Sequence, residues 1–553
     1  MPFMLKFAIY QCECGEIFKK KQKDMSKFFK VFSLFLCMKW KVGLLVLVAL
    51  LAVQVASAAT ITVCPSGCDY TSIQDAINAA SPGDTILVGD GEYAGDIIVN
   101  KSVSLIAENR YGAVINGSGG VYSIPPDPTS GAGIIIKAND VLVDGFIIKN
   151  IPSGGDGIII SGERNNIILR NLNITAEDFV ISIASAPSDT LSNITIENVT
   201  AFDTDSPPDQ HGWDIGGVDA ITNLTLRNIY TETYIFSVRA FNSMANIYVE
   251  NVTVKSNMSA TIGILNAPNI TVLNTTFLLE FGEGGDPVEE ATGIFCGDNC
   301  TIRDSYFEGN GTIIIANRSA TIENVTVKTN YPFGSEGTYY GNVEVGDYSL
   351  VTRSTIEILN PGNESYGLSL CGHGSVVYLN SFLNWTTPVD PTETTCFSGF
   401  SEGSPNNLNS TEEFTYLYGG NVYTSRLGNY YSDYACTDSD NDGICDNPRT
   451  FDAENIDYYP LAQLASLYEF GGLEPTPTTT VTTTTTTTTE TTPTGALPPE
   501  EISTTTTSIP VIIPPAEEGP SLWGFLTSIY GILTIATIIT AGFVVWLYSR
   551  KAS

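Results

Sequence analysis

The hexamer NIILRN, residues 166–171, recurs as NITIEN (193–198), NLTLRN (223–228), NIYVEN (246–251) and NITVLN (269–274). Looser copies begin at residues 140, 299, 319 and 375. Within each copy apolar and polar residues alternate, which is the period of a β-strand with one buried face. The copies are about 20 to 30 residues apart, and Gly, Asn, Asp and Ser between them favour turns. The sequence therefore predicts many short strands built by one internal repeat.

A solenoid explains the repeat better than a β-sandwich does, because a sandwich gives no reason for one hexamer to recur. If each repeat is one coil, equivalent strands pair in parallel about 4.8 Å apart and their inward side chains form columns. The Asn residues at the ends of the hexamer then lie at corners, where they hydrogen-bond to the next coil. We therefore predict an all-β, right-handed parallel β-helix of roughly 10–13 coils over residues 59–400.

The start of this region carries a family resemblance. Residues 72–80 have helical apolar spacing at Ile73, Ala76, Ile77 and Ala80, and SPGDT (81–85) ends the helix. A small amphipathic helix followed by SPGDT and strands resembles the pectin-lyase-like β-helix superfamily. The resemblance implies that this short helix caps the first coil of a right-handed parallel β-helix.

The composition limits the classes of function. The 553 residues include 26 Lys and Arg against 60 Asp and Glu, a net charge of −34. This surface repels nucleic acid and suits divalent cations or an extracellular setting, so we expect no nucleic-acid partner.

Both ends carry membrane-directed signals. Residues 1–58 contain a basic flank, an apolar run and the small residues Ala56-Ser57-Ala58, which together indicate a signal peptide and a mature start near residue 59. Residues 521–548 are apolar and long enough to form a transmembrane helix, and residues 549–553 form a basic tail that favours the cytoplasm. We therefore expect a single-pass cell-membrane protein with an extracellular ectodomain.

The segment between the ectodomain and the membrane has a composition of its own. Residues 471–520 are rich in Thr and Pro, which predicts an extended stalk, commonly O-glycosylated. N-glycosylation acceptors of the type Asn-x-Ser/Thr are also abundant before the stalk. The predicted acceptors are Asn173, Asn193, Asn198, Asn223, Asn251, Asn269, Asn274, Asn324 and Asn384.

Eight cysteines follow the signal segment, an even number that suits oxidising conditions. They fall into local couples, and proximity suggests pairing although the sequence does not fix the connectivity. The suggested pairs are Cys64 with Cys68, Cys296 with Cys300, Cys371 with Cys396, and Cys436 with Cys445.

A candidate metal loop, CTDSDNDGICD, occupies residues 436–446. The side chains of Asp438, Asp440, Asp442 and Asp446, with the carbonyl of Ile444, offer the hard oxygen ligands that Ca²⁺ prefers. The loop is not a full EF-hand, because Arg449 stands where that motif has its bidentate Glu. We predict a structural calcium ion that closes a C-terminal cap over residues 401–470.

The cap sequence carries a second resemblance. Residues 427–462, with LGNYYSDY, DSDNDGICDNP and NIDYYPLA, resemble the end of NosD-type repeat proteins, and the anchored arrangement looks like archaeal surface proteins. The NosD resemblance implies a copper-binding accessory role. Copper sites favour His, Met or Cys ligands, and this chain has 2 His and 6 Met.

Two stretches are candidates for catalysis. Residues 201–214 gather Asp203, Asp205, Asp209, His211 and Asp214, and carboxylates beside a histidine can do acid–base work. Gly372-His373-Gly374 matches one element of the pectin-hydrolase pattern, whose other elements are missing. A solvated loop and a turn histidine are the plain alternatives for the two stretches.

We therefore predict a cell-surface glycoprotein whose ectodomain is structural, adhesive or glycan-binding, with surface-layer proteins or glycans as partners. A polysaccharide lyase or hydrolase is the alternative, and a copper-binding accessory protein is a second one.

Overall fold

A computed structural model describes residues 58–470, except 118–130, 152–153, 185–186, 205–211, 265, 280–290, 310, 331–333, 336–337, 340, 362–363, 392–395 and 397–404. The predicted signal peptide, stalk and transmembrane segment lie outside the described residues. Among the residues described, no helix combines the length and apolar character needed to cross a membrane.

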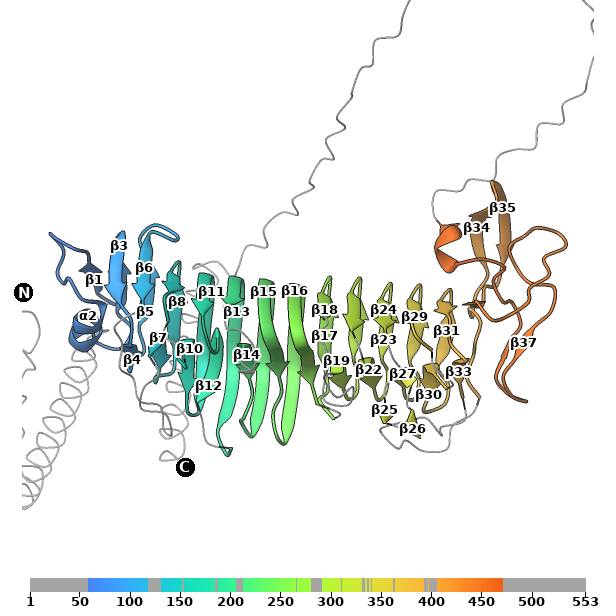
Figure 1. Cartoon of the computed structure of the whole chain (residues 1–553), viewed down its shortest axis with the longest axis horizontal. Coiled ribbons are helices and arrows are strands. Elements are labelled where there is room, and N and C mark those ends of the chain that lie inside the picture. The colour runs from blue at the N-terminus through green and yellow to red at the C-terminus, as the bar shows by residue number, and fades with distance from the viewer. Residues whose placement is uncertain are drawn as a thin grey trace, which may run out of the picture. The chain divides into compact units, whose positions relative to one another are not determined.

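The described chain is a parallel β-solenoid with three faces, and Figure 1 shows its strands stacked along one direction. The first face holds the repeated hexamers. It consists of β1 (Thr60–Val63), β2 (Thr85–Val88), β5 (Ser104–Ala107), β8 (Val141–Asp144), the first parts of β11 (Arg164–Ala176), β13 (Thr190–Asp203), β15 (Ala220–Val238) and β16 (Ser243–Gly263), then β17 (Ile270–Leu273), β20 (Thr301–Arg303), β23 (Thr321–Glu323), β28 (Leu350–Thr352) and β31 (Val376–Tyr378).

The second face follows each hexamer after a corner. It consists of β3 (Gly91–Ala94), β6 (Ala113–Asn116), β9 (Ile147–Lys149), the next parts of β11, β13, β15 and β16, then β18 (Thr276–Leu279), β21 (Tyr306–Gly309), β24 (Thr326–Thr329), β29 (Thr355–Ile358), β32 (Ser381–Leu383) and β36 (Tyr430–Tyr431).

The third face completes each coil. It consists of β4 (Ile97–Val99), β7 (Ala132–Ile136), β10 (Asp156–Ser161), β12 (Ile181–Ala184), β14 (Gly212–Ile215), the last parts of β15 and β16, then β19 (Ala291–Cys296), β22 (Gly311–Ala316), β27 (Gly341–Val345), β30 (Tyr366–Leu370) and β33 (Thr387–Asp390). A short hairpin, β25 (Gly334–Ser335) and β26 (Thr338–Tyr339), stands between β24 and β27.

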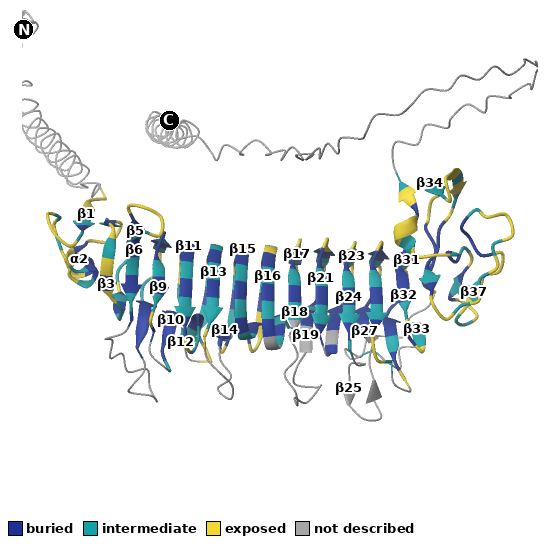
Figure 2. Cartoon of the chain, turned by 45° about the horizontal axis from the view of Figure 1, so that its top comes forward, coloured by how far each residue is buried: buried dark blue, intermediate teal, exposed yellow. Residues whose placement is uncertain are grey.

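The core follows from the alternation in the hexamer. Leu169, Ile196, Leu226, Val249 and Val272 are register partners on successive coils, and all are buried. Figure 2 shows the same alternation of buried and less buried residues along the strands. The parallel β-helix prediction is therefore confirmed.

The corners of the first face are left-handed. The first residue of each main hexamer has a positive φ, for example 54° at Asn193, and so has the last, for example 55° at Asn198. Asn tolerates this conformation, and its amide bonds to the equivalent amide of the neighbouring coil. The predicted stacking of Asn at the corners is confirmed, for example by the bond from Asn223 Nδ2 to Asn193 Oδ1 (2.9 Å).

Helix α2 (Ile73–Ala79) lies at the N-terminal end of the solenoid. Ser72 caps it by accepting from the Asp75 amide, and Ile73, Ala76 and Ile77 are buried. The first strand is also shielded, because Asp69 Oδ2 accepts from the backbone N–H of Thr62 (2.9 Å) and so occupies a donor on the edge of β1.

The C-terminal region is antiparallel and carries its own small core. It contains β34 (Phe414–Tyr418), β35 (Asn421–Ser425), β37 (Arg449–Thr450), β38 (Ile456–Asp457), the 3₁₀ turn η1 (Ala465–Leu467) and β39 (Glu469–Phe470). Buried polar side chains connect it to the last coils: Asn380 Oδ1 accepts from the Ser354 amide, Asn429 Oδ1 from the Asn380 amide, and Asp457 Oδ2 from the Asn429 amide.

Candidate functional site

The loop at 436–446 brings together three of its predicted ligands. Carboxylate oxygens of Asp438, Asp440 and Asp442 lie within 4.8 Å of one another. Burial, followed by the charges of Asp440 and Asp438, raises the pKa of the Asp442 carboxyl. Three crowded carboxylates repel one another, and a hard divalent ion fits such a donor set because it relieves that repulsion.

The other two predicted ligands have different surroundings. Asp446 accepts from the Ser439 hydroxyl (2.6 Å) and does not belong to the group of three. The side chain of Ile444 is buried in the small core of the cap, and its amide donates to Asp442 Oδ1 (2.7 Å). The structure therefore supports a three-carboxylate core for the loop, and the ligand roles of Ile444 and Asp446 stay predictions.

Tyrosines hold this loop against the cap. The hydroxyl of Tyr416 donates to the Asp442 carbonyl (2.9 Å), and that of Tyr468 donates to the Gly443 carbonyl. Gly443 has φ +90°, and a Cβ there would lie 2.8 Å from the Tyr418 ring. The conformation of the loop thus depends on Gly443, on two tyrosines within β34 and on Tyr468, which directly precedes β39.

Disulfide bonds fix several turns of the described chain. They join Cys64 to Cys68, Cys296 to Cys300, Cys371 to Cys396, and Cys436 to Cys445. The last one spans the acidic loop itself, so it closes that loop independently of any metal.

The predicted acidic cluster at 203–214 is described only at its ends. Asp205, Asp209 and His211 lie outside the described residues. Asp203 accepts from the Tyr234 amide (3.3 Å), and Asp214 lies on β14 in register with Ser182 and Ser237.

Asp214 belongs to a polar column that sequence reasoning missed. Its neighbours in sequence, Trp213 and Ile215, point into the core, so Asp214 points to the outside of the third face. Burial raises the pKa of the Asp214 carboxyl, with Arg239 and Ser237 acting against the shift. The sequence signal was the alternation itself, which places Asp214 outward between two apolar residues, but no sequence pattern marked its pairing with Ser182 and Ser237 on neighbouring coils.

Asp156 lies beside the same column. The Ser182 hydroxyl donates to its Oδ2, and the residue is 5% exposed. Burial raises the pKa of Asp156 to about 7, with Asp178 adding to the shift. Two carboxyl groups with raised pKa values therefore flank Ser182 on neighbouring coils.

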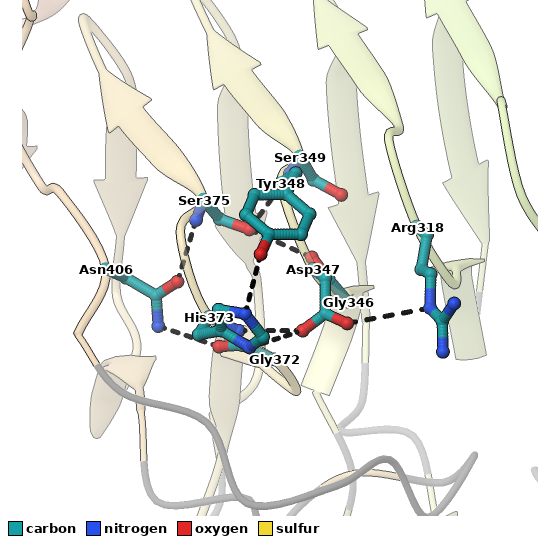
Figure 3. A network of polar contacts seen from close by, with 9 residues as sticks. All are labelled: Arg318, Gly346, Asp347, Tyr348, Ser349, Gly372, His373, Ser375 and Asn406. Atoms are coloured by element: carbon teal, nitrogen blue, oxygen red, sulfur yellow. Dashed lines mark hydrogen bonds and ion pairs between the residues drawn. The ribbon is translucent and has the colours of Figure 1, made fainter.

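The histidine of the GHG stretch takes part in a different network, shown in Figure 3. His373 Nδ1 lies 2.9 Å from Asp347 Oδ1, and its Nε2 lies 2.9 Å from the Tyr348 hydroxyl. Arg318, one coil earlier, lies 3.5 Å from the other Asp347 oxygen. Tyr348 is 63% exposed, whereas catalytic proton transfer gains most where water is excluded.

Packing accounts for both glycines of that stretch. A Cβ at Gly372 would lie 2.5 Å from the Asp347 nitrogen, and one at Gly374 would lie 2.8 Å from the Tyr348 ring. Tyr348 occupies a corner where earlier coils have Asn, with φ 56°. Gly374 thus makes room for the Tyr348 ring and Gly372 for Asp347, which favours the turn interpretation over the pectin-hydrolase one.

Comparisons with known proteins found partial similarity in sequence. No family model matches the chain. A cell surface glycoprotein of Methanothermus fervidus is 30% identical over 135 residues, which is 24% of this chain and 20% of that protein, so the chain spans about a fifth of that relative's length.

Several solved structures are similar in part. The pectate lyase Pel9A is 15% identical, with a TM-score of 0.25, over 61% of this chain and 78% of that one. A family 28 exopolygalacturonase of Yersinia enterocolitica is 12% identical, with a TM-score of 0.27, over 64% and 78% of the two chains. Likenesses of this size say nothing about activity, and the parallel register of the strands carries the fold. By that register the chain is a parallel β-helix, and part of its sequence is similar to a cell surface glycoprotein.

Proposed function

We propose that this chain is a cell-surface glycoprotein that holds a rigid β-helical rod outside the membrane, with a structural or adhesive role toward surface-layer proteins or glycans. The signal-like segment, the Thr-rich stalk and the apolar segment at 521–548 support export and single-pass anchoring. The partial similarity to a cell surface glycoprotein supports the same location.

The observation that carries the proposal is the pairing of charges on the outer sides of the first and second faces. Successive coils place opposite charges side by side, so the charged groups of six such pairs each have a partner within the rod. The pairs are Arg170–Asp144 (2.8 Å), Arg227–Glu250 (2.9 Å), Arg303–Glu323 (3.2 Å), Arg353–Glu323 (2.8 Å), Lys255–Glu232 (3.0 Å) and Lys328–Glu357 (3.6 Å). Exposed pairs contribute about 0–1 kcal/mol each, so their main effect is to favour the correct register.

Hydroxyl groups fill much of the space beside these charges. Thr195 and Thr225 are register partners, and so are Thr271, Thr301 and Thr321, with Tyr248 between the two groups. This gives a flat row of outward groups spaced by about 4.8 Å. A long, regular, self-paired surface suits contact with an extended partner better than a reaction at one point.

A test of this proposal needs location and binding together. Protease treatment of intact cells should release ectodomain fragments, and the purified ectodomain should bind a glycan array or isolated surface-layer protein. A chain that resists the protease on intact cells but is cleaved after lysis would refute surface display. Absence of binding to both ligand classes would refute the adhesive role.

Calcium binding is the second part of the proposal. We propose that Asp438, Asp440 and Asp442 bind Ca²⁺ and that the ion stabilises the cap rather than serving in catalysis. The support is the hard-oxygen donor set and its contact with the tyrosines of the cap.

A glycan-active enzyme remains the second candidate function, favoured by the column on the third face. Carboxyl groups with raised pKa values, Asp156 and Asp214, are suited to general acid catalysis. A reducing-sugar assay and an ultraviolet assay for unsaturated products on acidic and neutral polysaccharides test it. Activity lost in Asp214→Asn and retained in Asp347→Asn would establish this candidate.

A further inference from the structure

Seven of the nine predicted N-glycosylation asparagines use their side-chain nitrogen in hydrogen bonds inside the rod, and an eighth, Asn193, accepts such a bond at its side-chain oxygen. At the corner before the first face, Nδ2 of each Asn donates to Oδ1 of the preceding coil: Asn223 to Asn193 (2.9 Å), Asn246 to Asn223 (2.9 Å), Asn269 to Asn246 (2.9 Å) and Asn299 to Asn269 (3.3 Å). The same holds at the corner after it: Asn198 to Asn171 (3.2 Å), Asn228 to Asn198 (2.9 Å), Asn251 to Asn228 (2.8 Å) and Asn274 to Asn251 (3.3 Å). We call these rows the two asparagine ladders.

Two predicted sites outside the ladders also use their side-chain nitrogen in a hydrogen bond to another coil. Asn324 Nδ2 donates to Asp304 Oδ1 (2.7 Å), and Asn384 Nδ2 donates to the Ile358 carbonyl (3.2 Å). Asn193 contributes its side-chain oxygen, because its Oδ1 accepts from Asn223 Nδ2. Its φ of 54° is left-handed, like that of the other asparagines at the same corner. All eight residues therefore serve a corner or an inter-coil contact.

Asn173 has different surroundings. It lies inside β11, on the second face, in register with Ile147 and Thr200. Its neighbours Leu172 and Ile174 are buried, so alternation directs the Asn173 side chain outward, and Thr175 of the same sequon points outward too. Among the described residues, no hydrogen bond involves the side-chain amide of Asn173, whereas its backbone N–H donates to the Phe146 carbonyl (3.0 Å), and its backbone is extended rather than left-handed.

We propose that Asn173 accepts an N-linked glycan and that the eight other asparagines act as structural residues. In the modification, a bond forms between Nδ2 and the anomeric carbon of an oligosaccharide donor carried on a lipid diphosphate. The bond from that carbon to the phosphate oxygen breaks, the lipid diphosphate leaves with the bonding electrons, and Nδ2 loses one proton to a base of the transferase.

The ladder geometry explains why the other sites are excluded. Amides of neighbouring coils stack about 4.8 Å apart, so a sugar on one Nδ2 would press against the amides of the coils on both sides. A sequon at a corner is also held in the left-handed conformation and bonded to a neighbour, whereas Asn173 and Thr175 present an extended, outward-facing acceptor. The inference rests on the proposed export, because the donor is met only outside the cytoplasm.

The experiment uses the full chain expressed in an archaeal host that N-glycosylates its exported proteins, followed by mass spectrometry of intact glycopeptides. Two matched substitutions remove a sequon without touching its asparagine: Thr175→Ala and Thr225→Ala, both on outward positions of a strand. We expect Thr175→Ala and Asn173→Gln to remove one glycan, and Thr225→Ala to leave the glycan mass unchanged.

Two results would overturn the inference. One is an unmodified Asn173 peptide from chains that protease treatment places outside the cell. The other is a sugar on Asn193, Asn223 or any other ladder asparagine in folded protein. Chains found only inside the cell would refute the proposed function and this inference together, so the protease result separates the two failures.

Discussion

Individual asparagines set the corners of this fold. Asn223 combines three properties that few residues share: it accepts a φ of 55°, its Nδ2 donates to Asn193 and its Oδ1 accepts from Asn246. The hexamer predicted this role because Asn recurs at both ends of the copy. At one later corner Tyr348 stands where the hexamer has Asn. The repeat does not predict a tyrosine there, so the contact of Tyr348 with His373 was not predicted.

The first prediction concerns that corner. Asn223→Ala removes two ladder hydrogen bonds and leaves a Cβ in the left-handed region, so we expect a loss of about 2 kcal/mol in the free energy of unfolding. Asn223→Gly loses the bonds but not the backbone conformation, and should recover about 1 kcal/mol of that loss. Urea denaturation checks both variants, and an equal effect of Ala and Gly would contradict the role of backbone conformation.

The second prediction concerns the pH dependence of stability. The pKa of Asp156 is about 7 in the folded protein, above its ordinary value of 3.8, so the folded state holds the proton more tightly than the unfolded state. Stability from this group is therefore present below pH 4 and is lost as the pH rises to 7. Each pKa unit corresponds to about 1.4 kcal/mol, so the loss between pH 5 and 7 is on the order of 2–3 kcal/mol.

Asp156→Asn removes the titrating group and isolates its contribution. We expect the variant to melt higher than the wild type at pH 8 and to show a shallower fall in Tm between pH 5 and 8. Asp457 also has a pKa of about 7, because it is buried, so part of the slope should remain in the variant. A slope unchanged by Asp156→Asn would show that this carboxyl is not the source.

At the scale of single elements, the acidic loop of the cap differs from the strands of the rod. Rod strands follow a period that can be read directly, whereas the loop packs against tyrosines far away in the sequence. The Tyr416 hydroxyl donates to the backbone carbonyl of Asp442, and no local sequence pattern predicts this hydrogen bond. The sequence therefore predicted the acidic cluster of the loop, but not the residues that hold the loop in place.

The third prediction tests calcium at this loop. A ligand present at a hundredfold excess over its Kd stabilises by about 2.7 kcal/mol, so chelation of the purified ectodomain should lower its Tm by several degrees. Asp440→Asn should reduce the effect, because it removes the most exposed of the three carboxylates. Asp446→Asn tests the ligand role that stays a prediction, and a Tm indifferent to chelator and calcium would contradict the proposed site.

The whole molecule is a stack of equivalent units, which explains why the fold was predictable while the function was not. The parallel register is predicted from a repeat that appears many times, so a deviation from the pattern in one copy does not change the prediction. Activity would depend on single positions such as Asp214, which occupies an ordinary outward position of a strand, so nothing in the repeat distinguishes it from its neighbours. The cap shares this difficulty, since it occurs once.

The fourth prediction follows from this equivalence. Removal of residues 247–269 joins Asn246 to Ile270 and deletes one coil, so β15 should pair directly with β17 and β18. We expect a folded protein with a smaller denaturant m-value, because stability in stacked repeats is close to additive. The deletion also leaves Arg227 opposite Leu273 in place of Glu250, so some stability is lost with the ion pair.

A deletion of half a coil serves as the control for this prediction. Removal of residues 247–256 takes out strand segments of two faces and shifts the register of every later coil. Loss of folding in this variant and retention in the full-coil deletion would support equivalence of coils. Equal failure of both would contradict it.

The asparagine ladders also have a direction. Each hydrogen bond of the two rows runs from an amide to the coil that precedes it in the chain, and the row after the first face begins on a carboxylate, with Asn171 donating to Asp144 (2.6 Å). A chain that is threaded through a membrane with its N-terminus first thus meets, for each new coil, acceptors that have already emerged. If the chain is exported as proposed, the rod can lengthen coil by coil from its N-terminal end, before the C-terminal cap forms.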